Sequence, residues 1–226
     1  MPPEAGEGGA GGGGGDASAP VVVDRPPPTT LLRFDRVERT LHWVNATLFG
    51  ILMLTGAALY AGPISTLVGN REFVRNVHVY SGLFLPIPVL IAIAGRRGAR
   101  LRTDFGRLNR WSRDDARWFR RKRQHAVQLG KFNPGQKLNA AFVAGAGAVM
   151  LGTGSIMHWF DAFPLDWRTG ATFAHDWFAL GIWVAVLGHI FFALRDQDAL
   201  EAMLGGEISA KWARTKAPLW YEELTK

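Results

Sequence analysis

Four long apolar stretches dominate the pattern of hydrophobic and polar positions along this chain of 226 residues. They cover residues 41–60, 76–94, 138–160 and 171–194, and each reaches the roughly 20 residues that a helix needs to cross a hydrocarbon core of about 30 Å. Helices of a soluble bundle carry charges along their outer face, but the first three stretches contain no Asp, Glu, Lys or Arg and the fourth contains only Asp176. The pattern therefore predicts an all-α integral membrane protein, a bundle of four transmembrane helices.

The segments that flank these stretches have a different composition. Residues 1–30 are rich in Gly and Pro and cannot bury enough apolar surface to offset the entropy lost on ordering, so we expect a disordered tail. This tail has no apolar run of the length found in a secretory signal peptide. Residues 31–200 are expected to form the four-helix domain, and residues 201–226 a cytoplasmic tail. No internal repeat is evident.

The basic residues are concentrated in one loop. The chain has 26 Lys and Arg and a net charge of +7, and 14 of the basic residues lie between residues 95 and 137, with three acidic ones. With four spans, this loop and both termini share one side and carry 23 basic residues, against three in the two opposite loops. Because cytoplasmic loops are enriched in Lys and Arg, we expect the N- and C-termini to be cytoplasmic. Because the basic loop lies between two membrane spans, we expect it to contact anionic lipid or a partner subunit rather than nucleic acid.

Histidine is the residue type that carries the candidate chemistry. The chain has no Cys, which excludes disulfides, Cys-ligated iron–sulfur clusters and covalently attached c-type haem. The topology places His42 and His189 near the cytoplasmic ends of the first and fourth spans, and His78 and His175 near the outer ends of the second and fourth. His175 and His189 are 14 residues apart, which is about 21 Å along a helix and nearly the same face. The sequence therefore predicts two His pairs, His42 with His189 and His78 with His175, at two depths.

Paired imidazoles on facing helices are a common way to hold b-type haem, so the two pairs predict two haem b groups stacked along the membrane normal. Zinc is a rival, although two imidazoles at each depth fall short of its usual four ligands. A proton relay is another, although it would use Asp or Glu in mid-membrane. A single membrane His can also be a packing residue. We favour an interfacial anchor for His158, which precedes Trp159 and Phe160, and a solvated position for His125.

Basic and small residues near the histidines could complete a haem site. Arg36 or Arg39 is a candidate partner for the propionates of the cytoplasmic haem, and Arg75 for those of the outer haem. Several glycines within the spans could provide clearance for a flat macrocycle, although Gly is frequent in membrane helices in any case. These are Gly50, Gly56, Gly82, Gly181 and Gly188.

Four motifs together resemble the gamma subunit of membrane-bound formate dehydrogenases, a four-helix di-haem cytochrome b. They are Arg-Val-Glu-Arg-Thr-Leu-His-Trp at 36–43, Arg-Asn-Val-His at 75–78, Gly-Lys-Phe-Asn-Pro-Gly-Gln-Lys at 130–137, and the spacing of His175 and His189. The resemblance covers about residues 33–222, and the motif at 130–137 is its most specific part. It implies that His42 and His189 bind the cytoplasmic haem, and that His78 and His175 bind the periplasmic one. It also implies a quinone pocket bordered by Asn133, Gly135, Gln136 and His189.

The resemblance further implies a function in the bacterial cytoplasmic (inner) membrane. The chain would receive electrons from an iron–sulfur subunit, itself supplied by a molybdenum- or tungsten-dependent catalytic subunit, and pass them through two b haems to menaquinone or ubiquinone on the cytoplasmic side. It would therefore be a subunit of an oxidoreductase complex without the catalytic site, and a higher oligomer of the complex stays open. Two alternatives also stay open, namely the same cytochrome in a hydrogenase or sulfur-compound reductase, and a haem-free membrane anchor.

Overall fold

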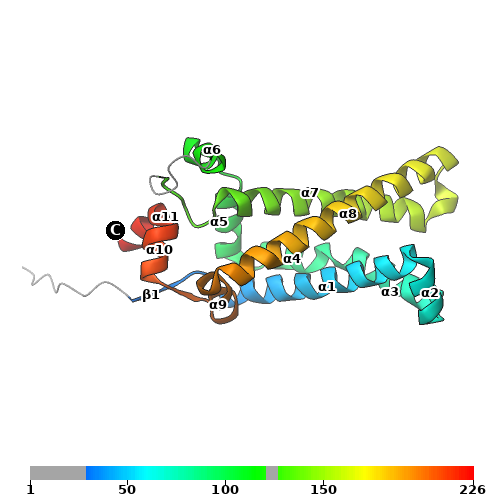
Figure 1. Cartoon of the computed structure of the whole chain (residues 1–226), viewed down its shortest axis with the longest axis horizontal. Coiled ribbons are helices and arrows are strands. Elements are labelled where there is room, and N and C mark those ends of the chain that lie inside the picture. Colours follow the sequence, from blue (N-terminus) through cyan, green and yellow to red (C-terminus); the bar gives the residue numbers. More distant parts are fainter. Residues whose placement is uncertain (1–28, 121–126) are drawn as a thin grey trace, which may run out of the picture.

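The computed structural model describes residues 29–120 and 127–226 as an elongated bundle of helices (Figure 1). The predictions for His125 and for residues 1–28 of the Gly/Pro-rich segment lie outside the described residues.

Four helical segments are long and apolar enough to cross a membrane. They are α1 (Arg36–Tyr60), α3 (Arg71–Phe84) continued by α4 (Pro86–Ala94), α7 (Pro134–His158) and α8 (Leu165–Arg195). Each begins a few residues before the span that hydropathy predicts, and at the start of α1, α3 and α7 a polar side chain caps the first turn. Asp35 and Glu38 form a capping box at the start of α1, and Asn133 and Gln136 form one at the start of α7. The predicted four-helix membrane bundle is confirmed.

The second membrane-spanning segment is interrupted at Leu85, between α3 and α4. Pro86 follows directly and has no N–H to donate to the preceding turn, and Pro88 lies two residues further. The break therefore has a local cause in the sequence.

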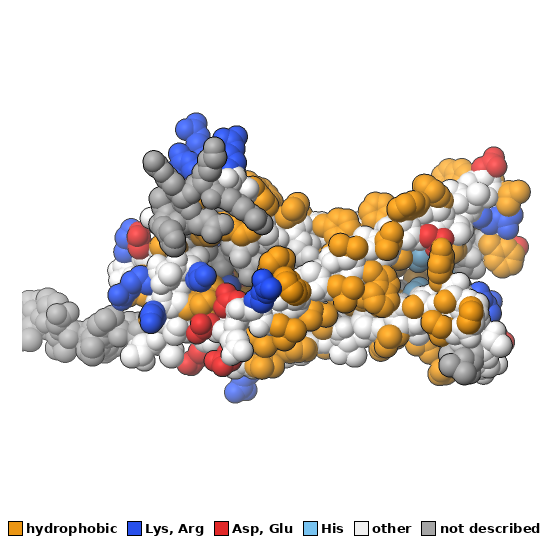
Figure 2. All heavy atoms as spheres, viewed as in Figure 1, with side chains coloured by type: hydrophobic (Ala, Val, Ile, Leu, Met, Phe, Trp, Pro, Cys, Tyr) orange, Lys and Arg blue, Asp and Glu red, His pale blue; other side chains and the backbone are white. Residues whose placement is uncertain are grey.

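The four helices pack as two antiparallel hairpins. α1 lies against α3, and α7 lies against α8, whereas contacts between the two hairpins are fewer. Large apolar side chains point outward along the bundle, as Leu54 and Phe192 do with 70% and 68% of their surface exposed. Figure 2 shows these hydrophobic side chains along the helices, with the charged side chains gathered mainly at one end. An apolar outer surface of this kind is what a helix in lipid requires.

Short helices form the two ends of the bundle. One end, called here the far end, carries α2 (Gly62–Val68) between α1 and α3, and η3 (Phe160–Ala162) between α7 and α8. The opposite end, called here the basic end, carries η1 (Arg96–Gly98), α5 (Ala99–Leu108) and α6 (Arg113–Phe119) in the loop between α4 and α7.

The residues before α1 and after α8 form one packed unit at the basic end, called here the terminal unit. Strand β1 (Thr30–Leu32) pairs antiparallel with β2 (Glu207–Ser209), beside α9 (Gln197–Gly205), α10 (Ala210–Lys216) and α11 (Pro218–Thr225). Its core is a cluster of buried apolar side chains around Trp220, namely Leu31, Ala202, Ile208, Ala213 and Ala217. Gly206 makes the turn before β2 with a φ of +100°, and a Cβ there would lie 2.8 Å from the Phe34 carbonyl oxygen. The segment expected to be a tail is therefore folded against the start of α1.

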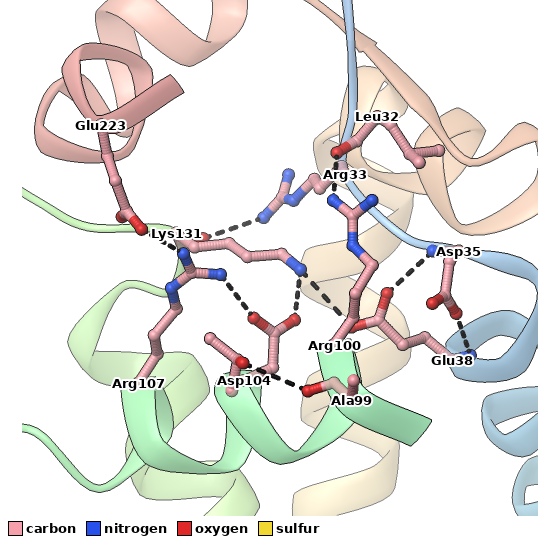
Figure 3. Close-up of polar contacts among 11 residues, drawn as sticks. Leu32, Arg33, Asp35, Glu38, Ala99, Arg100, Asp104, Arg107, Lys131 and Glu223 are labelled. Carbon is pink, nitrogen blue, oxygen red and sulfur yellow. Dashed lines mark hydrogen bonds and ion pairs between the residues drawn. The ribbon is translucent and has the colours of Figure 1, made fainter. Parts of the chain in front are cut away.

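A buried cluster of charges ties this end together (Figure 3). The ammonium of Lys131 donates to the carboxylate of Asp104 on α5 and lies 3.5 Å from the carboxylate of Glu38 on α1. Arg107 pairs with Asp104 at 2.9 Å and also with Glu223 on α11. Burial alone would raise the pKa of Asp104, but a hydrogen bond with Glu38, the positive charge and hydrogen bond of Lys131, and a hydrogen bond from Arg107 outweigh it and hold this pKa below its ordinary value.

Removing the central side chain of the terminal unit tests its packing. We expect Trp220→Ala to destabilise the unit by about 3–5 kcal/mol, because it leaves a cavity among side chains that cannot close it. The effect is measured as a lower thermal unfolding temperature of the detergent-solubilised protein and faster proteolysis after α8. Leu224→Ala, on the exposed face of the same helix, is the control and should change little. Equal behaviour of the two variants would contradict the packed unit.

The charge cluster predicts a pH-dependent stability. Asp104→Asn leaves the buried Lys131 incompletely paired, at a cost of about 3 kcal/mol. Because the pKa of Asp104 is depressed in the folded protein, the stabilisation by its charge is complete at neutral pH and is lost as the pH falls through the folded-state pKa. The stability difference between wild type and variant, measured by thermal unfolding in detergent over a pH series, should therefore shrink in acid. Glu222→Gln, which removes an exposed ion pair with Lys226, should have little effect at any pH. If the loss of stability in Asp104→Asn did not vary with pH, it could not come from removal of the Asp104 charge.

Candidate functional site

Two pairs of imidazole rings lie close together between the helices, where His42, His78 and His175 are half-buried and His189 is exposed. His42 of α1 and His189 of α8 form the basic-end pair, with ring centroids 6.0 Å apart and ring planes at 59°. His78 of α3 and His175 of α8 form the far-end pair, with centroids 6.3 Å apart and planes at 65°. The side chains that the sequence spacing expects to meet therefore do meet, at two depths separated by 14 residues of α8, about 21 Å of helix rise.

The spacing within each pair leaves room for one metal ion between the rings. Metal–nitrogen bonds to imidazole are about 2 Å long, so two imidazoles that bind one ion from opposite sides have centroids about 6 Å apart. Both observed separations agree with this value. Within residues 29–120 and 127–226, no group of three or more His, Cys, Asp or Glu side chains is placed to hold a metal ion. Two axial imidazoles therefore fit these residues better than a four-ligand zinc site.

Each pair joins the two hairpins. The basic-end pair connects α1 to α8 and the far-end pair connects α3 to α8, where helix contacts are fewer than within a hairpin. A planar group held between two imidazoles would lie in this less tightly packed layer. The fold thus supplies both the ligand geometry and an arrangement of helices suited to a macrocycle.

The far-end histidines are held by threonine side chains that the sequence analysis missed. Thr55 Oγ1 lies 2.9 Å from Nδ1 of His78, and Thr153 Oγ1 lies 2.9 Å from Nδ1 of His175. In each case the next residue is glycine, and the histidine lies 23 or 22 residues further along the chain. The recurrence of Thr-Gly at this spacing before a histidine is the sequence signal that could have identified these threonines. It is a short repeat shared by the two hairpins.

Asn133, Gly135 and Gln136 lie at the start of α7. The Asn133 and Gln136 side-chain oxygens accept hydrogen bonds from each other's backbone N–H at 2.9 and 3.0 Å, so their amide NH₂ groups are still available as donors. A Cβ on Gly181 of α8 would lie 2.9 Å from the Phe142 ring of α7. Because the two helices are antiparallel with equal rise, the start of α7, eight residues before Phe142, is level with His189, eight residues after Gly181. These residues therefore share the depth of the basic-end pair.

Two buried lysines, also missed from sequence alone, anchor the motif at 130–137. Lys131 belongs to the charge cluster described above. Lys137 pairs with Asp115 of α6 at 2.8 Å and donates to the Arg110 carbonyl. Both lysines belong to the motif at 130–137, but the sequence alone does not show which distant carboxylates they pair with.

The remaining candidates lie at the ends of the bundle. Arg36 and Arg39 line a shallow groove on α1, where Arg39 also donates to the Leu204 carbonyl. Arg75 lies one turn before His78 and is 3.7 Å from Glu72, with 60% of its side chain exposed. Their roles toward propionates stay predictions. His158 is exposed at the end of α7 and packs edge-on against Trp159 with a centroid distance of 5.1 Å, outside both pairs.

Three curated relatives resemble the chain over most of its length. The formate dehydrogenase cytochrome b556(fdo) subunit of Escherichia coli K12 is 24% identical over 87% of this chain and 94% of its own length. The formate dehydrogenase cytochrome b556 subunit of Haemophilus influenzae is 24% identical over 85% of this chain and 83% of its own length. The nitrate-inducible formate dehydrogenase cytochrome b556(Fdn) subunit of E. coli K12 is 22% identical over 87% and 92%. The resemblance inferred from the sequence motifs is thus confirmed.

A family model described as prokaryotic cytochrome b561 matches residues 33–206. The match runs from just before α1 through the four membrane helices to the end of α9, and it includes both imidazole pairs. With this match, the chain belongs to the prokaryotic cytochrome b561 family.

Proposed function

We propose that the chain is the cytochrome b subunit of a formate dehydrogenase complex. It passes electrons from a partner iron–sulfur subunit through two b haems to a membrane quinone on the cytoplasmic side. The observation that carries this proposal is the pair of imidazole separations, 6.0 and 6.3 Å, at two depths between the hairpins. The relatives support the complex, since each is a formate dehydrogenase subunit by name.

Four histidines are the proposed axial ligands. His42 and His189 hold one haem b at the basic end, and His78 and His175 hold the other at the far end. When bound, haem b supplies a metal centre that takes up and releases one electron at a time. The residues of the chain fix the position and spacing of the two groups.

The charge distribution supports the proposed direction. The basic end carries the Lys- and Arg-rich loop and the terminal unit, which favours the cytoplasmic side of a bacterial inner membrane. The far end then faces the periplasm, where a partner iron–sulfur subunit and a molybdenum- or tungsten-dependent catalytic subunit would deliver electrons. With no Cys in the chain, a Cys-ligated iron–sulfur cluster must come from such a partner.

The proposed quinone pocket lies at the start of α7. Asn133 and Gln136 offer amide N–H donors to quinone carbonyl oxygens, and Gly135 between them allows the Trp118 ring to pack beside the two amides. A Cβ on Gly135 would already lie 3.4 Å from the Trp118 ring of α6. The two amides also cap α7, so their positions are fixed before any ligand binds.

Identifying the partner enzyme distinguishes a formate dehydrogenase subunit from the two alternatives, which are the same cytochrome in a hydrogenase or sulfur-compound reductase and a haem-free membrane anchor. Purification of the chain from its native membrane through an affinity tag should recover a formate-oxidising, quinone-reducing complex. Recovery of a hydrogenase or of a sulfur-compound reductase would move the same cytochrome to that complex. A stable partner on a colourless chain would instead identify a haem-free anchor.

Single substitutions test the ligand assignment. We expect His189→Ala to lose the basic-end haem, and His175→Ala to lose the far-end haem, because each substitution removes one of the two bonds between the iron and the chain. His158→Ala, the matched control at the far end, should retain both haems. Haem b per polypeptide, measured as the pyridine haemochrome of the purified protein, reports the loss. Full haem content in the first two variants, or loss of a haem in the third, would overturn the assignment.

A conservative substitution tests the quinone pocket. Asn133→Asp keeps an oxygen that caps α7 but removes the amide donor, so haem content should stay unchanged. Loss of one hydrogen bond to the quinone should raise the quinone concentration needed for half-maximal reoxidation of the reduced haems about tenfold. Asn109→Asp, in the same basic loop, is the control and loses only a bond to the Phe105 carbonyl. Unchanged reoxidation in Asn133→Asp would place the pocket elsewhere.

A further inference from the structure

Two threonines outside the proposed ligand set contact the far-end pair in the same way. Thr55 of α1 reaches Nδ1 of His78, and Thr153 of α7 reaches Nδ1 of His175, each at 2.9 Å. We propose that both threonines are positioning residues whose hydroxyl oxygens accept a hydrogen bond from the Nδ1–H of the imidazole and thereby lower the reduction potential of the far-end haem. The inference rests on the proposed function, because it takes the far-end pair to be haem ligands.

The hydroxyl hydrogens of both threonines are already used, which sets the direction of these contacts. Thr55 donates to the Ile51 carbonyl at 2.6 Å, and Thr153 donates to the Val149 carbonyl at 2.8 Å. A hydroxyl group has one hydrogen and two lone pairs, so each threonine oxygen can only accept from the imidazole. Nδ1 therefore carries the hydrogen, and in a neutral ring the lone pair is on Nε2. This is the tautomer that can bind a metal ion through Nε2.

The glycine after each threonine lets the imidazole lie close to the neighbouring helix. A Cβ on Gly56 would lie 3.3 Å from Cε1 of His78, and one on Gly154 would lie 3.4 Å from Cε1 of His175. The Thr-Gly unit of the first helix in each hairpin thus holds the histidine of the second. Because both hairpins contain the same unit with the same distance, the contact is a repeated feature of the fold.

The basic-end pair has no such support. Among the side chains that the structure describes, none forms a hydrogen bond with the ring of His42 or His189. A ligand imidazole that donates its second N–H to an acceptor is more basic and binds the more highly charged metal ion more tightly. The threonines therefore stabilise the oxidised state of the far-end haem selectively, which favours electron transfer toward the basic-end haem.

Redox titration of the full-length chain in membranes, followed by haem absorbance, tests this role. Thr153 is the primary position, because His78 has a second acceptor in the Leu52 carbonyl. Thr153→Val removes the hydroxyl at nearly constant volume, and Thr153→Ser restores it. The far-end component is the one that His175→Ala removes. The control is Thr47→Val on α1, since Thr47 also bonds a carbonyl one turn earlier, that of Trp43 at 2.9 Å, but is bonded to no histidine.

We expect Thr153→Val to raise the potential of the far-end haem and leave that of the basic-end haem unchanged. The reduction equilibrium should shift roughly three- to tenfold, about 30–60 mV for a one-electron couple. Thr153→Ser and Thr47→Val should behave as wild type. Loss of the far-end haem in Thr153→Val with retention in Thr153→Ser would also support the role.

Two results would overturn the inference alone. These are an unchanged far-end potential in Thr153→Val, and loss of the haem in both Thr153 variants, which would indicate packing rather than hydrogen bonding. A wild-type chain without a far-end haem would contradict both this inference and the proposed function, so the two failures are distinguishable.

Discussion

The structure depends on the placement of four imidazoles in a bundle that otherwise presents apolar side chains to its surroundings. A polar ring in the membrane interior is costly unless it has a partner. Here each ring faces a second ring at about the distance that one shared metal ion would set. The two pairs also link hairpins that contact each other little elsewhere. In the proposed function, the cofactors that carry electrons therefore also hold the two halves of the bundle together.

The two ends of the bundle support these pairs by different means. At the basic end, buried ion pairs of Lys131 and Lys137 fix the segment that leads into α7, and the terminal unit packs against the start of α1. At the far end, threonine hydroxyl groups hold the imidazoles directly. In the proposed function, the first arrangement stabilises the surface at the start of α7, where a quinone would bind and take up protons. In the proposed function, the second acts on the electronic properties of the far-end imidazoles.

The sequence predicted the bundle well because its signals are local. Hydropathy locates the spans, and helix periodicity relates His175 to His189 without any knowledge of the other helices. Other features depend on residues far apart in the chain. These are the ion pairs of Lys131, the pairing of strand 30–32 with strand 207–209, and the contacts of Thr55 and Thr153 with histidines. These residues are not part of the periodic hydrophobic pattern that marks the membrane helices. Apart from the Thr-Gly recurrence, such contacts follow only from how the helices pack side by side.

The haem content of the purified wild-type chain tests the central claim most directly. Quantified as pyridine haemochrome against polypeptide concentration, it should equal two haems of the b type per chain, because the bundle has two imidazole pairs at separate depths. A chain that binds one haem or none when isolated intact from its membrane would contradict the account.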